Sequence, residues 1–267
     1  MEETPKKLLQ WHAAFYAGIQ IELEDEAENL VFENEHMLGT KPMQVDVLIT
    51  KKDAEISVQK NIGKIFRKYN LIEYKSPEDY LSTNDFYKVL GYALFYMADT
   101  PHVNEIKPEE ISITFVCSKY PRKLIKYLIS QGHNVEKKEV GIYYVYGEKF
   151  AIQIVVNPTL SEERNLWLKN LTNEISDIAS VEKLARAYES KKENTLYSSV
   201  MDILIRANVA KFSEVKNMCE ALKELYAEEL KEGILNTLLQ LVRDDLLNLS
   251  VAAERAQMSV EEFRQKL

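Results

Sequence analysis

Hydrophobic and polar positions follow two different patterns along this 267-residue chain. In the first part, short β-prone runs are separated by turn residues, as expected for strands that alternate with helices. From Asn157-Pro158 onward, apolar residues recur at helical spacing, and Gly233 is the only later glycine. The pattern predicts an α/β domain with a mixed sheet over residues 1–158. An all-α C-terminal extension is predicted over residues 159–267.

The predicted first domain opens with a helix at residues 6–27. Ser76-Pro77 carries a second helix-start signal, a capping serine followed by proline at the first helical position. Further helices are predicted at 60–68, 84–98 and 121–130. The predicted strands are 30–38, 43–50, 55–59, 70–74, 111–117 and a hairpin of 141–146 with 150–156.

The predicted extension contains helices that end in a short pair. Capping boxes are expected at Thr159–Glu162 and Ser259–Glu262. The short pair resembles a helix-turn-helix tail, but its second helix opens with acids. We therefore expect it to pack or oligomerise rather than to read a major groove. The predicted helices are 160–173, 177–190, 194–207, 212–231, 233–247, 250–257 and 259–266.

Charged residues interrupt two of the apolar strand candidates. Asp46 lies within Val45–Ile49, and Glu73 and Lys75 lie two positions apart near the end of the 70–74 run. Side chains alternate faces along a strand, so residues 73 and 75 point the same way. A buried charge costs several kcal/mol unless it is paired or bound to metal. The pattern therefore predicts either a metal site or a buried ion pair of Lys75 with Asp46 or Glu73.

The net charge of −8 argues against a protein that binds nucleic acid over its whole surface. The charge is uneven, however: residues 21–35 hold seven acids and no base, whereas residues 51–75 are rich in lysine. A second basic cluster comprises Lys119, Arg122, Lys123 and Lys126. Such a distribution fits either a metal-using nuclease or an ordinary solvated surface.

Other function classes lack their motifs. The chain has no G-x-S-x-G, Walker or GxGxxG pattern, and its four histidines lack ligand spacing. Cys117 and Cys219 are too isolated for a disulfide framework or structural zinc. This cysteine usage is typical of proteins from a reducing compartment. With neither a signal peptide nor an apolar membrane span visible, a soluble cytoplasmic protein without a membrane partner is expected.

Asp46 and the Glu73-Tyr74-Lys75 triplet resemble the signature of the PD-(D/E)XK nuclease superfamily, whose members share a restriction-endonuclease-like αβββαβ core. Residues 62–67, 72–77 and 85–92 are similar to a bacterial family of this superfamily. That family is related to the recombination-promoting nuclease and transposase-like group. The closer resemblance covers about residues 10–100.

The resemblance implies a metal-dependent DNA endonuclease with Asp46 and Glu73 as metal ligands and the Tyr74 carbonyl as a third. Lys75 would orient or activate the attacking water and balance charge in the transition state. Glu22 is the candidate for an additional acid from the first helix, with Glu26 and Glu35 as alternatives. Val45 stands where the family usually has proline.

The implied cofactor is Mg²⁺ or Mn²⁺, since hard cations take oxygen ligands. The implied partner is DNA, bound by a basic segment beside the site, and cleavage of both strands would favour a homodimer. Lys88 and Tyr92 stand at the spacing of a family glutamine and tyrosine; alternatively, Tyr92 is core and Lys88 solvated. A catalytically degenerate module for DNA binding or protein assembly is the alternative function. The predicted DNA contacts are Lys60, Lys64, Arg67, Lys68, Lys88 and Tyr92.

Overall fold

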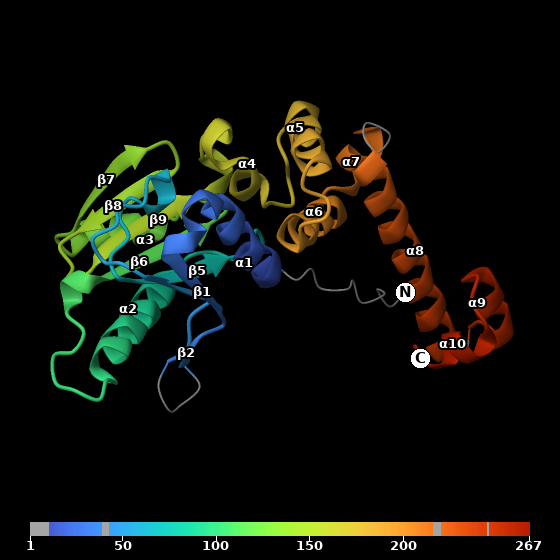
Figure 1. The fold of residues 1–267 in the computed structure, drawn as a ribbon, viewed down its shortest axis with the longest axis horizontal. Coiled ribbons are helices and arrows are strands. Elements are labelled where there is room, and N and C mark those ends of the chain that lie inside the picture. Colours follow the sequence, from blue (N-terminus) through green and yellow to red (C-terminus); the bar gives the residue numbers. More distant parts are fainter. Residues whose placement is uncertain (1–10, 39–42, 216–219, 245) are drawn as a thin grey trace. The chain divides into compact units, whose positions relative to one another are not determined.

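The computed structural model describes residues 11–38, 43–215, 220–244 and 246–267, and they form an α/β protein with a seven-stranded mixed sheet (Figure 1). The strand order is β1-β4-β5-β6-β9-β8-β7, and β2 pairs with β3 in a separate two-stranded sheet. Strands β1, β4 and β5 form an antiparallel meander, β6 and β9 continue parallel to β5, and β8 and β7 add an antiparallel hairpin. The strands are β1 (Leu30–Asn34), β2 (Met37–Leu38), β3 (Met43–Gln44), β4 (Val47–Lys51), β5 (Tyr69–Lys75), β6 (Ile111–Cys117), β7 (Asn134–Glu139), β8 (Ile142–Tyr146) and β9 (Ala151–Val156).

The parallel strands define one end of the sheet, which we name the carboxyl edge. Lys75 at the end of β5 pairs in register with Cys117 at the end of β6, which pairs with Val156 at the end of β9. Ligand sites of open α/β sheets tend to lie outside the carboxyl ends of the strands. The opposite end, where β5 begins at Tyr69, is named the amino edge.

Helices cover both faces of the sheet. Phe86 of α2 stacks on Phe115 of β6 at a centroid distance of 5.5 Å, so α2 covers the face that carries the odd-numbered residues of β5 and β6. Phe15 of α1 stacks on Tyr74 at 4.3 Å, so α1 covers the other face. The helices of this part are α1 (Trp11–Glu22), α2 (Thr83–Ala98), α3 (Arg122–Ser130), α4 (Glu162–Asn170) and α6 (Thr195–Ala207).

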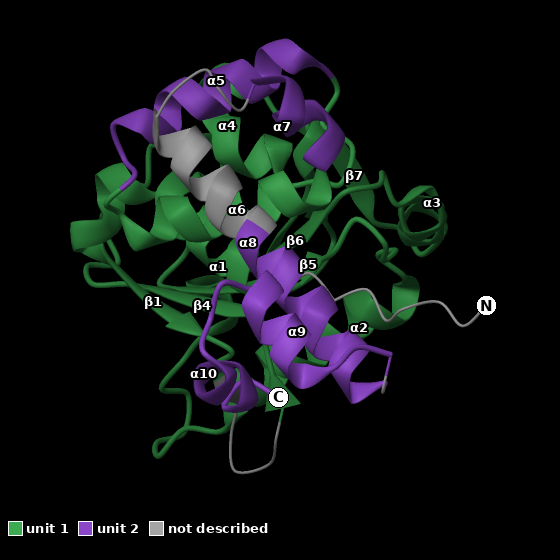
Figure 2. Cartoon of the chain, turned by 90° about the vertical axis from the view of Figure 1, so that its right-hand side faces the viewer, with its two compact units in different colours: residues 1–176, 193–208 green, residues 177–192, 209–267 purple. Residues whose placement is uncertain are grey.

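The chain divides into two units, coloured separately in Figure 2. The first unit comprises residues 1–176 and 193–208, and the second comprises 177–192 and 209–267. Helices α4 and α6, which lie beyond the predicted boundary near residue 158, therefore group with the sheet. The second unit is helical and contains α5 (Ile178–Glu189), α7 (Val209–Val215), α8 (Glu220–Arg243), α9 (Leu249–Arg255) and α10 (Val260–Arg264).

The predicted short helix pair at the C-terminus is present as α9 and α10. Ala252, Ala253 and Phe263 are buried against Leu238 and Leu239 of α8, so the pair packs on the end of that helix. The capping box predicted at Ser259 is confirmed: its Oγ accepts from Glu262 N at 3.2 Å, and Glu262 Oε2 accepts from Ser259 N at 2.9 Å. Of the described helices, none is both long and apolar enough to cross a membrane.

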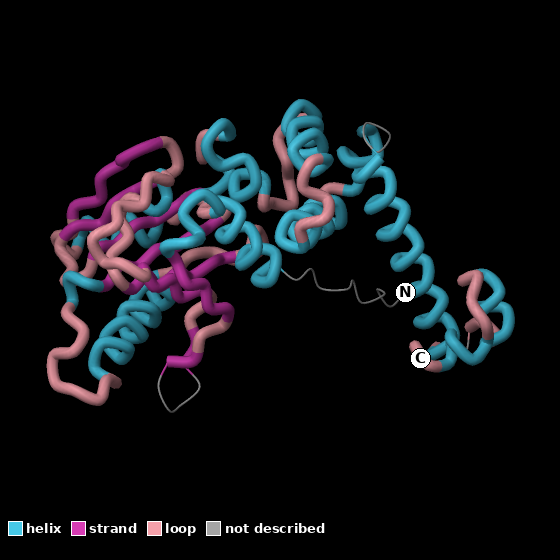
Figure 3. Tube along the Cα trace, in the orientation of Figure 1, coloured by secondary structure: helices cyan, strands magenta, loops and turns pink. Residues whose placement is uncertain are grey.

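The predicted strand at residues 55–59 is wrong, and Figure 3 shows a loop there. Lys51 extends along this loop and donates from Nζ to the carbonyls of Ala54 at 2.6 Å and Ile56 at 2.8 Å. Backbone acceptors that would serve a strand partner are thus used by a side chain. The predicted strands at 30–38 and 43–50 are each broken, the first at Glu35, whose φ is 45°, and the second at Val45-Asp46.

Helix starts and ends also differ from prediction. Helix α2 begins at a capping box of Ser82 and Asp85 rather than at Ser76, which instead donates to Asp79 in a turn at 2.8 Å. Ser161 caps α4 without a side-chain hydrogen bond, so the capping box predicted there is absent. The predicted break between helices 212–231 and 233–247 is wrong, since α8 continues through Gly233. One glycine costs a helix only about 1 kcal/mol, which packing can offset. Of the predicted first helix at 6–27, residues 6–10 lie outside the described residues, and its last four residues belong to a 3₁₀ helix at Glu24–Asn29.

Candidate functional site

Asp46 lies where the ladder between β4 and β5 stops. The last registered pair is Val47 with Ile72, and beyond it β5 continues to Lys75 with only β6 beside it. The Tyr74 N–H, which has no strand partner on the β4 side, donates to Asp46 Oδ2 at 2.7 Å. The carboxylate therefore takes the place of a backbone acceptor and is fixed at the carboxyl edge.

Glu73 and Lys75 lie on one face of β5, as their spacing predicts, and α2 covers that face. Lys75 Nζ lies 2.7 Å from Asp85 Oδ1 and 3.4 Å from Glu73 Oε1. Lys88, one turn along α2 from Asp85, places its Nζ 2.8 Å from the same Glu73 oxygen. The sequence Asp85, Lys75, Glu73, Lys88 thus forms a chain of alternating charges between strand and helix.

Burial and neighbouring charge together raise the pKa values of both Asp46 and Lys75. Burial and then the Glu73 carboxylate raise the pKa of Asp46 to about 6, against smaller opposing effects of the Tyr74 N–H, His12 and Lys75. Burial lowers the pKa of Lys75, but Asp85 and Glu73 outweigh it and leave that pKa raised. Lys75 is accordingly an ammonium cation at neutral pH, suited to donate hydrogen bonds and offset negative charge.

Each of the two carboxylates keeps one oxygen without a hydrogen bond to the described residues. Asp46 uses Oδ2 for Tyr74, and its Oδ1 lies 3.7 Å from His12 Nε2; Glu73 uses Oε1 for both lysines. Because N–H and C=O of one strand residue point to the same side, the Tyr74 carbonyl also faces the Asp46 side. Mg²⁺ is commonly held by one or two carboxylates and several waters. Asp46, Glu73 and the Tyr74 carbonyl fit that donor set.

Glu22, the predicted additional acid, is buried elsewhere in the sheet domain. Its Oε1 accepts from the Leu168 N–H of α4 at 3.0 Å, and its Oε2 lies 2.9 Å from Lys60 Nζ. Burial raises the pKa of Glu22, and Lys60 opposes that shift. Within the described ranges, no group of three or more His, Cys, Asp or Glu side chains could hold a metal ion. Glu22 therefore does not join Asp46 and Glu73 in such a group, and its contacts are those of a structural ion pair.

The two alternative acids also make structural contacts. Glu26 Oε1 accepts from the N–H groups of Gln59 and Lys60, both at 3.2 Å, and so fixes the loop before residue 61. Glu35 is exposed, and its backbone N–H donates to the Asp46 carbonyl at 3.1 Å. Neither residue contributes a carboxylate to a three-acid group in the part of the chain that the structure describes.

The basic segment of residues 60–68 does not lie beside the site. Arg67 and Lys68 precede Tyr69 at the amino edge, whereas Lys75 ends the strand. The seven residues of β5 lie between this segment and the end of the strand at Lys75, which corresponds to about 20 Å. Lys68 Nζ lies 3.8 Å from Glu110, and Arg67 is exposed without a carboxylate within ion-pair distance among the described residues.

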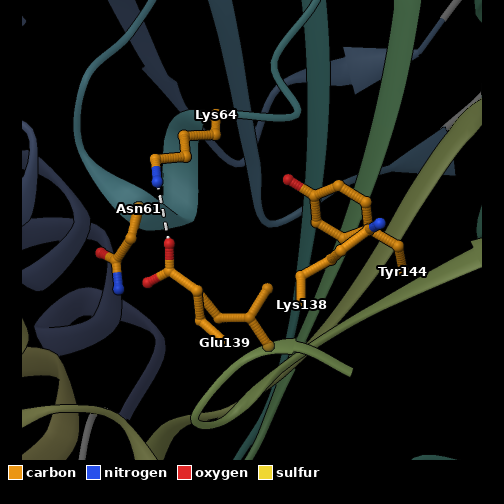
Figure 4. Close-up of a pocket in the computed structure, with 6 residues that line it drawn as sticks. Asn61, Lys64, Lys138, Glu139 and Tyr144 are labelled. Carbon is orange, nitrogen blue, oxygen red and sulfur yellow. Dashed lines mark hydrogen bonds and ion pairs between the residues drawn. The ribbon is translucent and has the colours of Figure 1, made fainter. Parts of the chain in front are cut away.

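Lys64 of the same segment is paired with a carboxylate on the edge hairpin. Its Nζ lies 2.8 Å from Glu139 Oε1, and Arg164 binds the other Glu139 oxygen at 2.9 Å. Figure 4 shows this pair at a pocket of about 230 Å³ whose lining also includes Asn61, Lys138 and Tyr144. The charge of Lys64 is thus compensated within the protein.

Lys88 and Tyr92 lie together on α2, as the predicted spacing requires. The Lys88 ammonium is 5.7 Å from the centroid of the Tyr92 ring, while its hydrogen bond goes to Glu73. Burial lowers the pKa of Lys88, but the Glu73 carboxylate outweighs it and leaves that pKa raised. Lys88 therefore pairs with Glu73 of the site, while 43% of the Lys88 side chain remains exposed.

Sequence reasoning missed Asp85 and His12. A signal for Asp85 was available: it precedes Lys88 by three residues, so the two share one face of α2. His12 carries no such signal, because only the packing of α1 on Tyr74 brings it to Asp46. The rings of His12 and Tyr74 lie 5.8 Å apart, edge to face. Helix α1 thus contributes to the site through His12 and not through Glu22.

No family model, no curated protein and no solved structure matches this chain. The fold and the side chains at the carboxyl edge are therefore the features that bear on its function. Those side chains are Asp46, Glu73, Lys75, Asp85, Lys88 and His12.

Proposed function

We propose that the protein is a Mg²⁺- or Mn²⁺-dependent DNA endonuclease of the PD-(D/E)XK type, with a restriction-endonuclease-like core. The observation that carries the proposal is the arrangement of Asp46, Glu73 and Lys75. One carboxylate lies at the broken end of β4, hydrogen-bonded to the Tyr74 N–H. The second carboxylate and the ammonium lie on one face of the adjacent β5, 3.4 Å apart.

The order of elements supports the same proposal. Helix α1 is followed by the meander of β1, β4 and β5, then by α2 and by β6 parallel to β5. This is the αβββαβ order that the sequence resemblance implies. Strands β7 to β9 and the helices after residue 158 are additions to that core.

In the proposed reaction, Asp46, Glu73 and the Tyr74 carbonyl would hold the metal ion. A bound Mg²⁺ supplies a Lewis acid that polarises the phosphate and lowers the pKa of the attacking water. Lys75 donates hydrogen bonds to that water or to a phosphate oxygen and offsets negative charge that develops in the transition state. Asp85 positions the Lys75 ammonium, and Lys88 orients the Glu73 carboxylate.

The ion pairs of the cluster favour a second function, that of a degenerate module for DNA binding or assembly. Glu73 contacts two ammonium groups, and Lys75 contacts two carboxylates, so the charges compensate one another without any metal. Such a network also stabilises a fold. The two functions differ in one testable respect. Only the nuclease cleaves DNA, and it requires Glu73 and Lys75 to do so.

The test is cleavage of supercoiled plasmid and of linear duplex and single-stranded DNA with Mg²⁺, Mn²⁺ or EDTA. Asp46→Asn, Glu73→Gln and Lys75→Met are compared with the exposed control variants Glu163→Gln and Lys137→Met. We expect metal-dependent cleavage in wild type and both controls, and at least a hundred-fold loss in each site variant. Cleavage that survives all three site substitutions, or no cleavage of any substrate by folded wild type, overturns the nuclease proposal. Linear rather than nicked product, with a dimer in solution, would match the expected homodimer.

A further inference from the structure

A group of basic side chains lies beside the site at the carboxyl edge. Lys119 follows Cys117 by two residues, and Cys117 is the register partner of Lys75. With adjacent strands about 4.8 Å apart, the Cα atoms of Lys119 and Lys75 lie within about 10 Å of each other. The basic residues continue into the first turns of α3. We name as the carboxyl-edge patch Tyr80, Lys119, Tyr120, Arg122, Lys123 and Lys126.

The cations of the carboxyl-edge patch have no carboxylate partner among the described residues. Lys119, Arg122, Lys123 and Lys126 are all exposed, and none has an acid within ion-pair distance. The two acids of the neighbouring turn are Glu78, which is exposed, and Asp79, which accepts from Ser76 Oγ at 2.8 Å. The patch and this turn thus hold four bases against two acids in a protein of net charge −8.

Exposed aromatic rings lie among these cations. Tyr80 and Tyr120 are 40% and 39% exposed. The Tyr80 hydroxyl accepts from the Lys123 N–H at 3.1 Å, so its ring is fixed against the first turn of α3. The Tyr120 ring is supported edge to face by Tyr143 at 5.1 Å. Both rings are held by the protein and retain exposed surface.

From this combination we propose that the carboxyl-edge patch binds a single-stranded segment of nucleic acid and feeds its phosphodiester to the adjacent site. The proposal rests on the proposed nuclease function and names its substrate class. Unpaired lysines and arginines attract phosphates, and fixed aromatic rings stack on bases. Bases within a duplex are stacked on one another and offer no face to a tyrosine ring. The aromatic component therefore selects single strands over duplex.

The experiment measures binding of fluorescent oligonucleotides to the full chain in EDTA by anisotropy. The probes are a single-stranded 20-mer, its duplex and an acidic polyglutamate peptide. The variants are Tyr120→Leu, which removes only a ring, and Arg122→Gln with Lys123→Gln, which remove two charges. The matched control is Lys64→Gln with Lys68→Gln, two bases whose charges are paired with Glu139 and Glu110.

We expect wild type to prefer the single strand and to bind it more tightly than the peptide. Tyr120→Leu should weaken single-strand binding roughly ten-fold and leave duplex binding within two-fold, because it removes a ring on which only an unpaired base can stack. The double charge variant should weaken both nucleic acids and reduce the salt slope by about 1.4 for the single strand. The control pair should stay within two-fold of wild type.

Equal affinity for duplex and single strand, with no effect of Tyr120→Leu, overturns the proposal in favour of a duplex site. Tighter binding of the peptide overturns it in favour of an acidic protein partner. An equal loss in the control pair shows general attraction and overturns it too. Because EDTA prevents cleavage, binding without any turnover in the metal assay would overturn the nuclease proposal alone. If the patch variants bind nucleic acid as tightly as wild type and still cleave DNA in the metal assay, this inference alone is overturned.

Discussion

Two basic segments of similar composition lie at opposite ends of the sheet and differ in how far neighbouring acids compensate their charge. In residues 60–68, Lys60, Lys64 and Lys68 each pair with a glutamate. In the carboxyl-edge patch, no described acid pairs with any of the four cations. Arg67 is left without a described acid partner in the first segment, whereas all four cations of the carboxyl-edge patch are, and only the patch lies beside Lys75. Local charge in a sequence therefore indicates a binding surface only when the fold leaves it uncompensated.

The largest expected effect is a difference in DNA cleavage between variants of Lys75 and Lys68, which lie at opposite ends of β5. Lys75→Met should lower DNA cleavage at least a hundred-fold, because it removes the ammonium that Asp85 and Glu73 hold at the site. Lys68→Met at the amino edge should leave cleavage within two-fold. The measurement is initial rate with Mg²⁺, after circular dichroism has shown that both variants are folded. Similar losses in the two variants would contradict the contrast between the edges.

The second effect concerns stability at the amino-edge segment. Glu22→Ala should lower the free energy of unfolding by about 3 kcal/mol, because it leaves Lys60 and the Leu168 N–H without their buried acceptor. Urea titration measures the loss. Glu139→Ala, which removes the exposed partner of Lys64, should cost less than about 1 kcal/mol. If Glu22→Ala costs no more than Glu139→Ala, the assignment of Glu22 as a structural acid is wrong.

The third prediction uses pH at the carboxyl edge. The pKa of Asp46 is about 6 in the folded protein, above the ordinary value of 3.8. Between these values the native state binds more protons than the unfolded state, so this residue lowers stability as pH rises through the window. Asp46→Asn keeps an acceptor for Tyr74 and removes the charge. It should therefore be more stable than wild type by on the order of 2 kcal/mol at pH 8 without metal, and should show no such gain at pH 4.

Thermal unfolding of Asp46→Asn and wild type from pH 4 to pH 8, in EDTA, tests the third prediction. A stability difference that is independent of pH would show that Asp46 does not carry the shift. Glu163→Gln is the matched control, because this exposed carboxylate should give a small change at every pH.

The smallest effect should come from the exposed ion pair at the amino edge. Lys68→Gln breaks a contact of 3.8 Å with Glu110, both side chains being about one-third exposed. Solvent screens such pairs, so the free energy of unfolding should change by less than about 0.5 kcal/mol. Equilibrium urea titration at low and high salt measures it. A salt-dependent loss above 1 kcal/mol would show that this segment is electrostatically more important than the structure indicates.

Elements with a strong apolar pattern were predicted well from the sequence. Strand β6, in which every residue is buried, and the hairpin of β8 and β9 were found as expected. Strand β7 was missed because its residues are mostly polar and exposed at the sheet edge. The region 55–59 was misassigned because its alternation resembles a strand, whereas Lys51 binds its carbonyls. Side-chain competition for backbone groups leaves no trace in hydrophobic periodicity.

Within the candidate site, the sequence predicted only how residues of the same strand or helix are placed relative to one another. The two-residue period correctly placed Glu73 and Lys75 on one face. Asp46, predicted within the neighbouring strand, lies just before β4 begins at Val47. The position of Glu22 was not predictable, because its partners Lys60 and Leu168 are distant in sequence. The basic segment at 60–68 was placed beside the site because it is close to Glu73 in the chain. Seven residues of extended strand carry it to the other edge.

The hydrogen bond from Tyr74 N–H to Asp46 also makes one backbone amide a reporter. This proton is donated to a carboxylate and not to a strand carbonyl, so its NMR chemical shift should follow the charge of that carboxylate. Protonation near pH 6, or a cation captured by Asp46, would each withdraw electron density from the acceptor and move the resonance. A two-dimensional amide spectrum of the intact chain could thus follow occupancy of the site directly. Such a titration needs neither substrate nor turnover.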